Sequence, residues 1–155
     1  MGRCFLKLKV TYITPAFSLV ELLVVIACGG SLILAGIPSL HQFQREWSLW
    51  SSAYLLQSSL AWGRMHAISS NSPLMLQVGS GGRSIQWSDP ESGEVFSDSV
   101  RYLSGDTRIV ASPRRPLRFY PRGNAAPAGT YRVQNECGTF RVVVNIEGRI
   151  RVARE

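Results

Sequence analysis

Residues 17–37 read FSLVELLVVIACGGSLILAGI, and this run decides the fold. It carries one formal charge, that of Glu21. As a helix it would extend about 31 Å, which matches the hydrocarbon core of a bilayer. The run therefore predicts a membrane-spanning helix, with the basic residues Arg3, Lys7 and Lys9 on the cytoplasmic side and the rest of the chain outside.

Glu21 is the unexpected residue in this run. A carboxylate in the hydrocarbon core costs about 3 kcal/mol, so its presence indicates a partner that compensates the charge. An acidic residue in the apolar part also argues against an ordinary secretory signal, which would share the basic start and the apolar run.

With Phe17 before it and the apolar residues 22–27 after it, Glu21 resembles the class III signal of type IV pilins and type II secretion pseudopilins. In that family a short basic leader ends at a small residue, Phe opens the mature chain, and Glu is its fifth residue. The resemblance implies that residues 1–16 are a leader. It implies that a prepilin peptidase cuts between Ala16 and Phe17, whose amine is then methylated. It also implies that Glu21 compensates the N-terminal amine of a neighbouring subunit.

The chain departs from the family pattern at the cleavage site, where Ala16 stands in place of the usual Gly. The leader of 16 residues is also long. Two alternatives stay open beside an ordinary secretory signal. One is a lipoprotein signal, because residues 25–28 read VIAC, and the other is a plain single-span anchor.

Residues 39–70 contain no Pro and predict a helix that continues the anchor, with a bend at Pro38 and a stop at Asn71-Ser72-Pro73. Large apolar residues recur at spacings of three and four, with Gln57 as the polar break and with Leu56 and Leu60 widening the stripe. We expect this stripe to pack on a sheet. Its members are Leu40, Phe43, Trp47, Trp50, Tyr54, Gln57, Ala61, Met65 and Ile68.

The remaining residues predict short strands separated by turn residues. The expected strands are Leu74–Val78, Ser84–Trp87, Val100–Leu103, Arg108–Ala111, Leu117–Tyr120, Thr130–Val133, Thr139–Asn145 and Arg149–Ala153. The predicted fold class is α+β, a long N-terminal helix packed on an antiparallel β-sheet head. The expected organisation is a leader (1–16), a transmembrane or filament-core helix (17–38) and a pilin-like head (39–155).

The last forty residues are similar to the GspH/FimT branch of the pilin-like family. This similarity rests on LRFYPRG at 117–123, GTY at 129–131 and the final GRIRV at 148–152. The branch includes the H-type minor pseudopilin of type II secretion and a minor pilin of type IV pili. In some pilus members a C-terminal Gly-Arg-x-Arg motif contacts DNA during natural transformation. The resemblance implies such a role for Gly148, Arg149 and Arg151.

In a strand, Arg149 and Arg151 would lie on one face, about 6.6 Å apart, with Ile150 toward the core. Two guanidinium groups at that spacing suit successive phosphates. Arg132, Arg141 and Arg154 would extend the patch if their strands pair nearby. The competing interpretation is a solvated edge strand whose charges prevent aggregation.

Composition limits the remaining possibilities. The net charge is +7, and every cation after residue 16 is Arg, which is compatible with an anionic partner or with a solvated surface. The two His residues and the isolated Cys137 are too few to bind a metal, and we expect Cys137 to be buried without a disulfide. No catalytic motif or cofactor site is predicted, so we expect a protein that is not an enzyme.

The sequence thus predicts a single-pass inner-membrane protein with its head in the periplasm, assembled with other pilins into a pilus or pseudopilus. Two functions remain open. One is a minor pilin that contributes to pilus assembly and binds double-stranded DNA. The alternative is an H-type pseudopilin of a type II secretion system that contacts secreted proteins.

Overall fold

The computed structural model describes residues 18–155, without the side chains of residues 32–38. Two compact units make up the chain, Met1–Pro38 and Ser39–Glu155. The leader and the cleavage site predicted between Ala16 and Phe17 lie outside the described residues.

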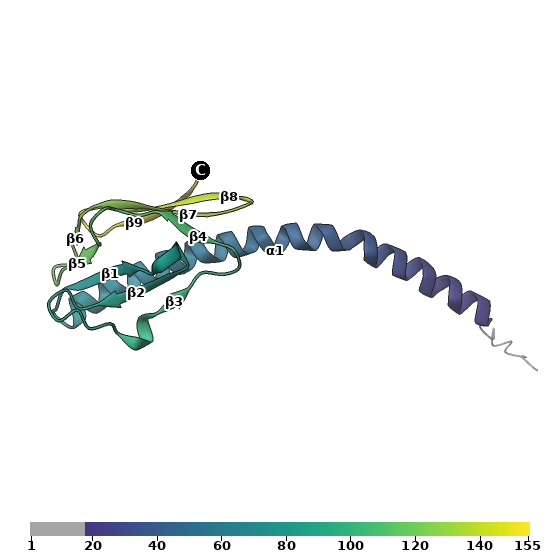
Figure 1. Cartoon of the computed structure of the whole chain (residues 1–155), viewed down its shortest axis with the longest axis horizontal. Helices are drawn as coiled ribbons and strands as arrows, with labels where there is room; N and C mark the ends of the chain where they lie inside the picture. The colour runs from purple at the N-terminus through teal and green to yellow at the C-terminus, as the bar shows by residue number, and fades with distance from the viewer. Residues whose placement is uncertain (1–17) are drawn as a thin grey trace, which may run out of the picture. The chain divides into compact units, whose positions relative to one another are not determined.

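The long helix predicted from the sequence is present as α1 (Leu19–Ser69), with Glu21 in its first turn (Figure 1). It ends before Asn71, whose φ of 50° is left-handed, and before Pro73, as predicted. Among the described residues, no helix is sufficiently long and apolar to cross a membrane. The anchor over residues 17–38 and the bend at Pro38 stay predictions.

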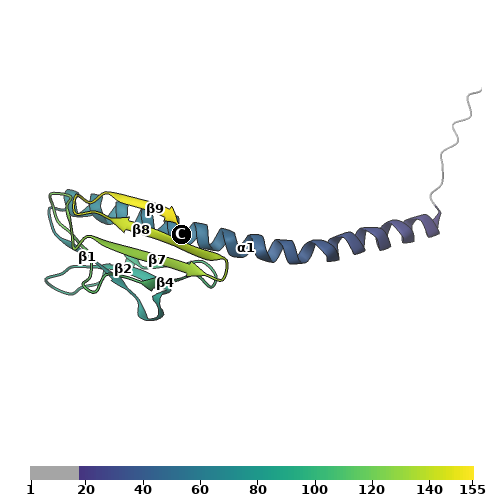
Figure 2. The same cartoon turned by 90° about the horizontal axis from the view of Figure 1, so that it is seen from above.

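The second unit contains two antiparallel sheets. The first sheet has the order β3-β2-β1-β5-β6, and its strands are β1 (Leu74–Val78), β2 (Ser84–Ser88), β3 (Arg101–Tyr102), β5 (Arg118–Phe119) and β6 (Ala125–Ala126). The second has the order β4-β7-β8-β9, and its strands are β4 (Arg108–Ala111), β7 (Gly129–Asn135), β8 (Gly138–Val144) and β9 (Ile150–Arg154). Two 3₁₀ turns, η1 (Ser80–Gly82) and η2 (Ser97–Ser99), connect strands of the head. Figure 2 shows β4, β7, β8 and β9 side by side.

One hydrophobic core joins both sheets to the second half of α1. The sheets supply its largest side chains, Trp87, Phe119 and Tyr131, all of them almost fully buried. The helix contributes smaller ones, Leu49, Ala53, Leu56, Leu60 and Ala67. The predicted α+β class, a helix packed on an antiparallel β head, is confirmed.

The helix stripe expected to pack on the sheet was wrong, because most of it is exposed. Trp47 and Trp50 are 58% and 44% exposed, whereas Leu56 and Leu60 are fully buried. The exposed members include Leu40, Phe43, Trp47, Trp50, Tyr54, Met65 and Ile68. The physical reason is space: the sheets already fill the core with large rings, so only small or aliphatic side chains fit between the helix and the sheets.

The strand predictions agree with the structure to within one or two residues at most ends. Two features were not predicted. The strand β6 was missed because two alanines between turns carry no periodic signal. The division into two sheets was also missed, since strand periodicity does not specify which strands pair.

Candidate functional site

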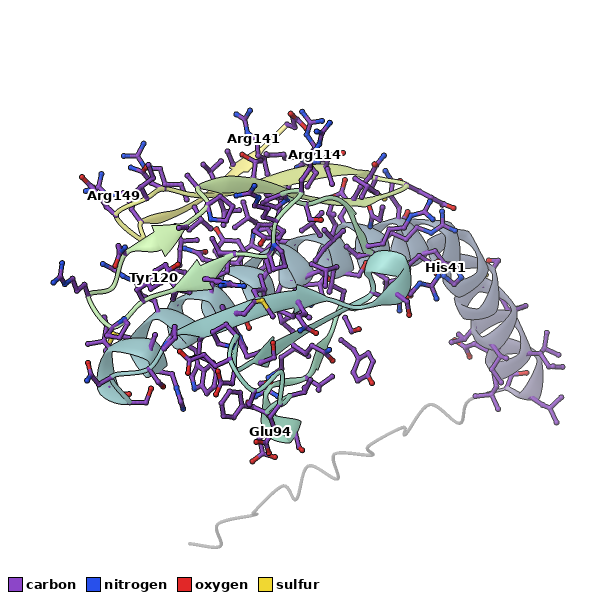
Figure 3. The ribbon with its side chains drawn as sticks, turned by 60° about the vertical axis from the view of Figure 1, so that its left-hand side comes forward. His41, Glu94, Arg114, Tyr120, Arg141 and Arg149 are labelled. Atoms are coloured by element: carbon purple, nitrogen blue, oxygen red, sulfur yellow. The ribbon has the colours of Figure 1, made fainter. Side chains whose placement is uncertain are left out.

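The outer face of the second sheet carries arginines from all four of its strands or their ends. Arg132 of β7 lies directly opposite Arg141 of β8, and Arg151 of β9 lies opposite Val143. All three arginines are exposed. Figure 3 shows Arg141 and Arg149 projecting from this sheet, away from the helix. We call Arg132, Arg141, Arg149 and Arg151 the arginine face.

Like charges placed directly opposite each other across two strands are destabilising. Arg132 is compensated by Glu155, whose Oε1 lies 3.2 Å from its Nη2. Within residues 18–155, the other three members of the arginine face form no ion pair. Their guanidinium groups are therefore free to receive an anion.

The C-terminal motif has the predicted alternation. Arg149 and Arg151 are exposed, and Ile150 between them packs against the core. Gly148 ends the β8–β9 turn with a φ of 74°, and its N–H donates to the carbonyl of Asn145 over 2.8 Å. The structure therefore brings both motif arginines to the outer side of the sheet.

A second constraint on Gly148 was not predicted. A Cβ at this position would collide with the carbonyl oxygen of Gly123 and lie 2.7 Å from Nε of Arg64. Arg64 of α1 donates to the carbonyls of Gly123 and Glu147, over 2.8 and 3.1 Å. It thereby ties the helix to the turn before Arg149. Its position within an apolar helical pattern gave no signal for this role.

The expectation that Arg154 extends the patch is wrong. Arg154 pairs with Phe140, which packs against the core, so its side chain leaves β9 on the face opposite to Arg151. It lines a pocket together with Phe43, Trp47 and Trp50 of the helix. In its place Arg108 joins the arginine face, because it lies opposite Gln134, which shares the outer side of β7 with Arg132.

Other residues singled out in the sequence show no site chemistry. Cys137 is a free thiol and is half-buried, rather than fully buried as expected. His66 packs between Trp62 and Phe96, with ring centroids 4.9 and 5.8 Å away. In the described part of the chain, no three His, Cys, Asp or Glu residues gather in a way that could hold a metal. Glu21 is exposed in the isolated chain.

Comparison with protein families gives a match over residues 52–148, to the family described as type II transport protein GspH. The chain belongs to the GspH family. Members of this family are minor pilins or pseudopilins, so the chain is a filament subunit that assembles with other pilins. The comparison with curated proteins gives no match.

Solved structures of minor pilins share the fold of this GspH family member. The type IV minor pilin FimU of Pseudomonas aeruginosa superposes with a TM-score of 0.61 at 18% identity, over 72% of this chain and 92% of that one. The minor pseudopilin EpsH from the type 2 secretion system of Vibrio cholerae gives a TM-score of 0.53 at 15% identity, over 66% and 94%. At these identities the likeness establishes the fold.

Proposed function

We propose that this GspH family member is a non-enzymatic minor pilin of a type IV pilus and that its arginine face binds double-stranded DNA. The observation that carries the proposal is the cross-strand pair Arg132–Arg141, with Arg149 and Arg151 exposed on the same sheet face. Guanidinium groups bind phosphate oxygens in a bidentate manner, and three of these four form no ion pair within the described residues.

Binding of this kind would be independent of base sequence. The arginines project from a sheet of antiparallel strands and follow no helix or ribbon that would enter a groove, so they favour contacts with the phosphate backbone. The contribution of each chain would be weak, and several copies or neighbours in a filament would raise the apparent affinity.

The proposal includes the route by which the chain reaches the filament. A prepilin peptidase removes residues 1–16, and residues 17–38 hold the mature chain in the inner membrane with its head in the periplasm. Glu21 then compensates the N-terminal amine of a neighbouring subunit during assembly. The support is the class III pattern around Phe17 and Glu21, together with the family membership.

A DNA-binding measurement on the head tests the DNA role. We expect the chain from Arg45 onward to bind a fluorescent duplex at low salt, and Arg149→Gln with Arg151→Gln to weaken that binding by about tenfold or more. Arg83→Gln with Arg122→Gln is the matched control, because both residues are exposed and neither lies in the second sheet. Equal binding by wild type and both double variants would refute the DNA role.

The second candidate function is that of an H-type minor pseudopilin in type II secretion, in contact with secreted proteins. The description of the matching family, a type II transport protein, favours it. Deletion of the gene distinguishes the two functions. Loss of transformation or of pili supports the first, and loss of exoprotein release with intact pili supports the second.

A further inference from the structure

Four aromatic residues form a continuous exposed ridge along α1. Phe43, Trp47, Trp50 and Tyr54 follow one another at spacings of four, three and four, and we call them the aromatic ladder. Consecutive ring centroids lie 6.3, 5.6 and 4.2 Å apart. The four side chains are 63%, 58%, 44% and 43% exposed. Stacked rings that remain this exposed in the isolated chain indicate a surface that is covered in the assembled protein.

The head does not use the aromatic ladder for its own stability. The core contacts of the helix come from another face, at Leu49, Leu56 and Leu60. The exposed apolar surface extends past the ladder to Leu40 before it and to Met65 and Ile68 after it. Beside the ladder, Phe140 and Arg154 close a pocket of about 230 Å³ with Phe43, Trp47 and Trp50. This combination of a ridge and an adjoining pocket is typical of a protein interface centre.

We propose that the aromatic ladder is the docking surface for the apolar N-terminal helix of a neighbouring pilin-like subunit. This inference rests on the filament role argued above and assigns that role to particular residues. The pocket beside the ladder would take one side chain of the neighbouring helix and so set its position along α1.

The shape of the ladder favours a helix as the partner. Eleven residues of helix extend about 16 Å, or three turns, which suits a second helix lying alongside at about 8–10 Å. The chain itself shows what a pilin-like N-terminal helix offers, since every side chain from Leu22 to Ile26 is aliphatic and more than half exposed. Neither surface carries a formal charge, so their contact would bury no unpaired ion.

Charge and length disfavour other occupants. The ladder residues are uncharged, and phosphate-binding arginines gather instead on the second sheet, so DNA is the poorer partner. The exposed apolar surface from Leu40 to Ile68 extends about 42 Å along the helix. One headgroup layer of a bilayer is only about 5–7 Å thick, so a membrane interface would leave most of this surface uncovered.

Photo-cross-linking on the full-length chain, in cells that produce its native machinery, tests the proposal. A photoreactive phenylalanine analogue replaces Trp47 or Trp50, and Trp62 is the matched control, because Trp50 and Trp62 are 44% and 46% exposed on different sides of the same helix. We expect adducts from positions 47 and 50 that map by mass spectrometry to the N-terminal helix of a pilin-like protein. Position 62 should give about tenfold less. Adducts mainly with lipid or DNA, equal adducts at all three positions, or none at 47 and 50 would overturn the proposal.

A substitution series separates this proposal from the filament role itself. Trp47→Ser with Trp50→Ser should lower the amount of chain in detergent-extracted filament complexes by about tenfold. The melting temperature of the variant should stay close to that of wild type because both rings are outside the core. The control is Trp62→Ser. If wild type is itself absent from these complexes, the filament role fails. If wild type is present and the double variant enters equally well, only the docking surface fails.

Discussion

Gly63 of α1 lies directly against the indole ring of Trp87 in β2. A Cβ at position 63 would lie 2.8 Å from Cε2 of that ring and closer still to two other ring atoms. One turn earlier, the hydroxyl of Ser59 accepts a hydrogen bond from Nε1 of Trp87 over 3.1 Å. The only glycine in the second half of the helix is therefore the point at which the helix approaches the first sheet most closely.

Replacing Gly63 with Ala should destabilise the head. Helix propensity alone would raise the free energy of unfolding by up to about 1 kcal/mol. Overpacking against the Trp87 ring should outweigh this gain and lower it by about 1–3 kcal/mol. Urea denaturation of the head measures the change. Ser58→Ala, at an exposed position on the same helix, should stay within about 0.5 kcal/mol of wild type. An unfolding free energy of Gly63→Ala at or above wild type would show that the ring yields.

The buried phenol of Tyr131 should make the head sensitive to alkali. Burial raises the pKa of Tyr131 far above its usual value near 10. The folded state therefore keeps the proton, while the unfolded state loses it as pH rises past about 10. Stability from Tyr131 is complete below that pH and is lost above it, by about 1.4 kcal/mol per pH unit. Tyr131→Phe should flatten the unfolding free energy between pH 10 and 12, whereas Tyr102→Phe, at an exposed position, should not.

The salt dependence of DNA binding should report the number of phosphate contacts. Two to four contacts predict a slope of log K against log salt of about −2 to −4. Arg149→Gln with Arg151→Gln should reduce the magnitude of that slope by about 2, since each lost phosphate contact removes about 1. Fluorescence anisotropy between about 50 and 200 mM salt measures it. An unchanged slope in this double variant would place the contacts elsewhere on the head.

Glu21→Ala should leave membrane insertion intact, or improve it, and should impair entry into filaments. The reason is that an unpaired carboxylate is costly in lipid but useful opposite the amine of a neighbouring subunit. Glu21→Gln is the matched variant, because it keeps the shape and removes the charge. Membrane fractionation and the content of filament complexes measure the two effects. Normal incorporation of both variants would remove the assembly role.

Processing should leave a mature chain that begins at Phe17 with a methylated amine. The class III pattern places the cut after Ala16, and this residue departs from the usual Gly. Ala16→Gly should therefore speed cleavage or leave it unchanged. Mass spectrometry of the N-terminal peptide decides the position. Cleavage near Ala35, or a lipid on Cys28, would contradict the pilin anchor.

The sequence was sufficient for the helix end and most strands, because Pro73 and the glycine-containing turns interrupt the periodic patterns locally. It was insufficient for the orientation of α1. Two apolar stripes run along the same helix, one aromatic and one of Leu and Ala, and periodicity favours whichever has the larger residues. Which stripe is buried depends on the space left by Trp87 and Phe119, which lie far away in the sequence.

The candidate site was predictable to a similar extent. Alternation along β9 was enough to place Arg149 and Arg151 together on the exposed side. The same alternation assigns Arg154 to the opposite face, but its inclusion in the patch relied on proximity in the sequence. The opposition of Arg132 and Arg141 required the register of β7 against β8, which the short turn at Glu136 and Cys137 sets.

The edges of the two sheets decide how this chain can polymerise. The first sheet ends in β3 and β6, each only two residues long. The second ends in β4 and β9, which carry exposed arginines at Arg108, Arg151 and Arg154. Short or charged edges resist the strand-by-strand growth that leads to amyloid-like aggregates. Concentrating such subunits side by side therefore carries little risk of irreversible cross-β stacking, and growth remains a reversible process that adding or removing helices controls.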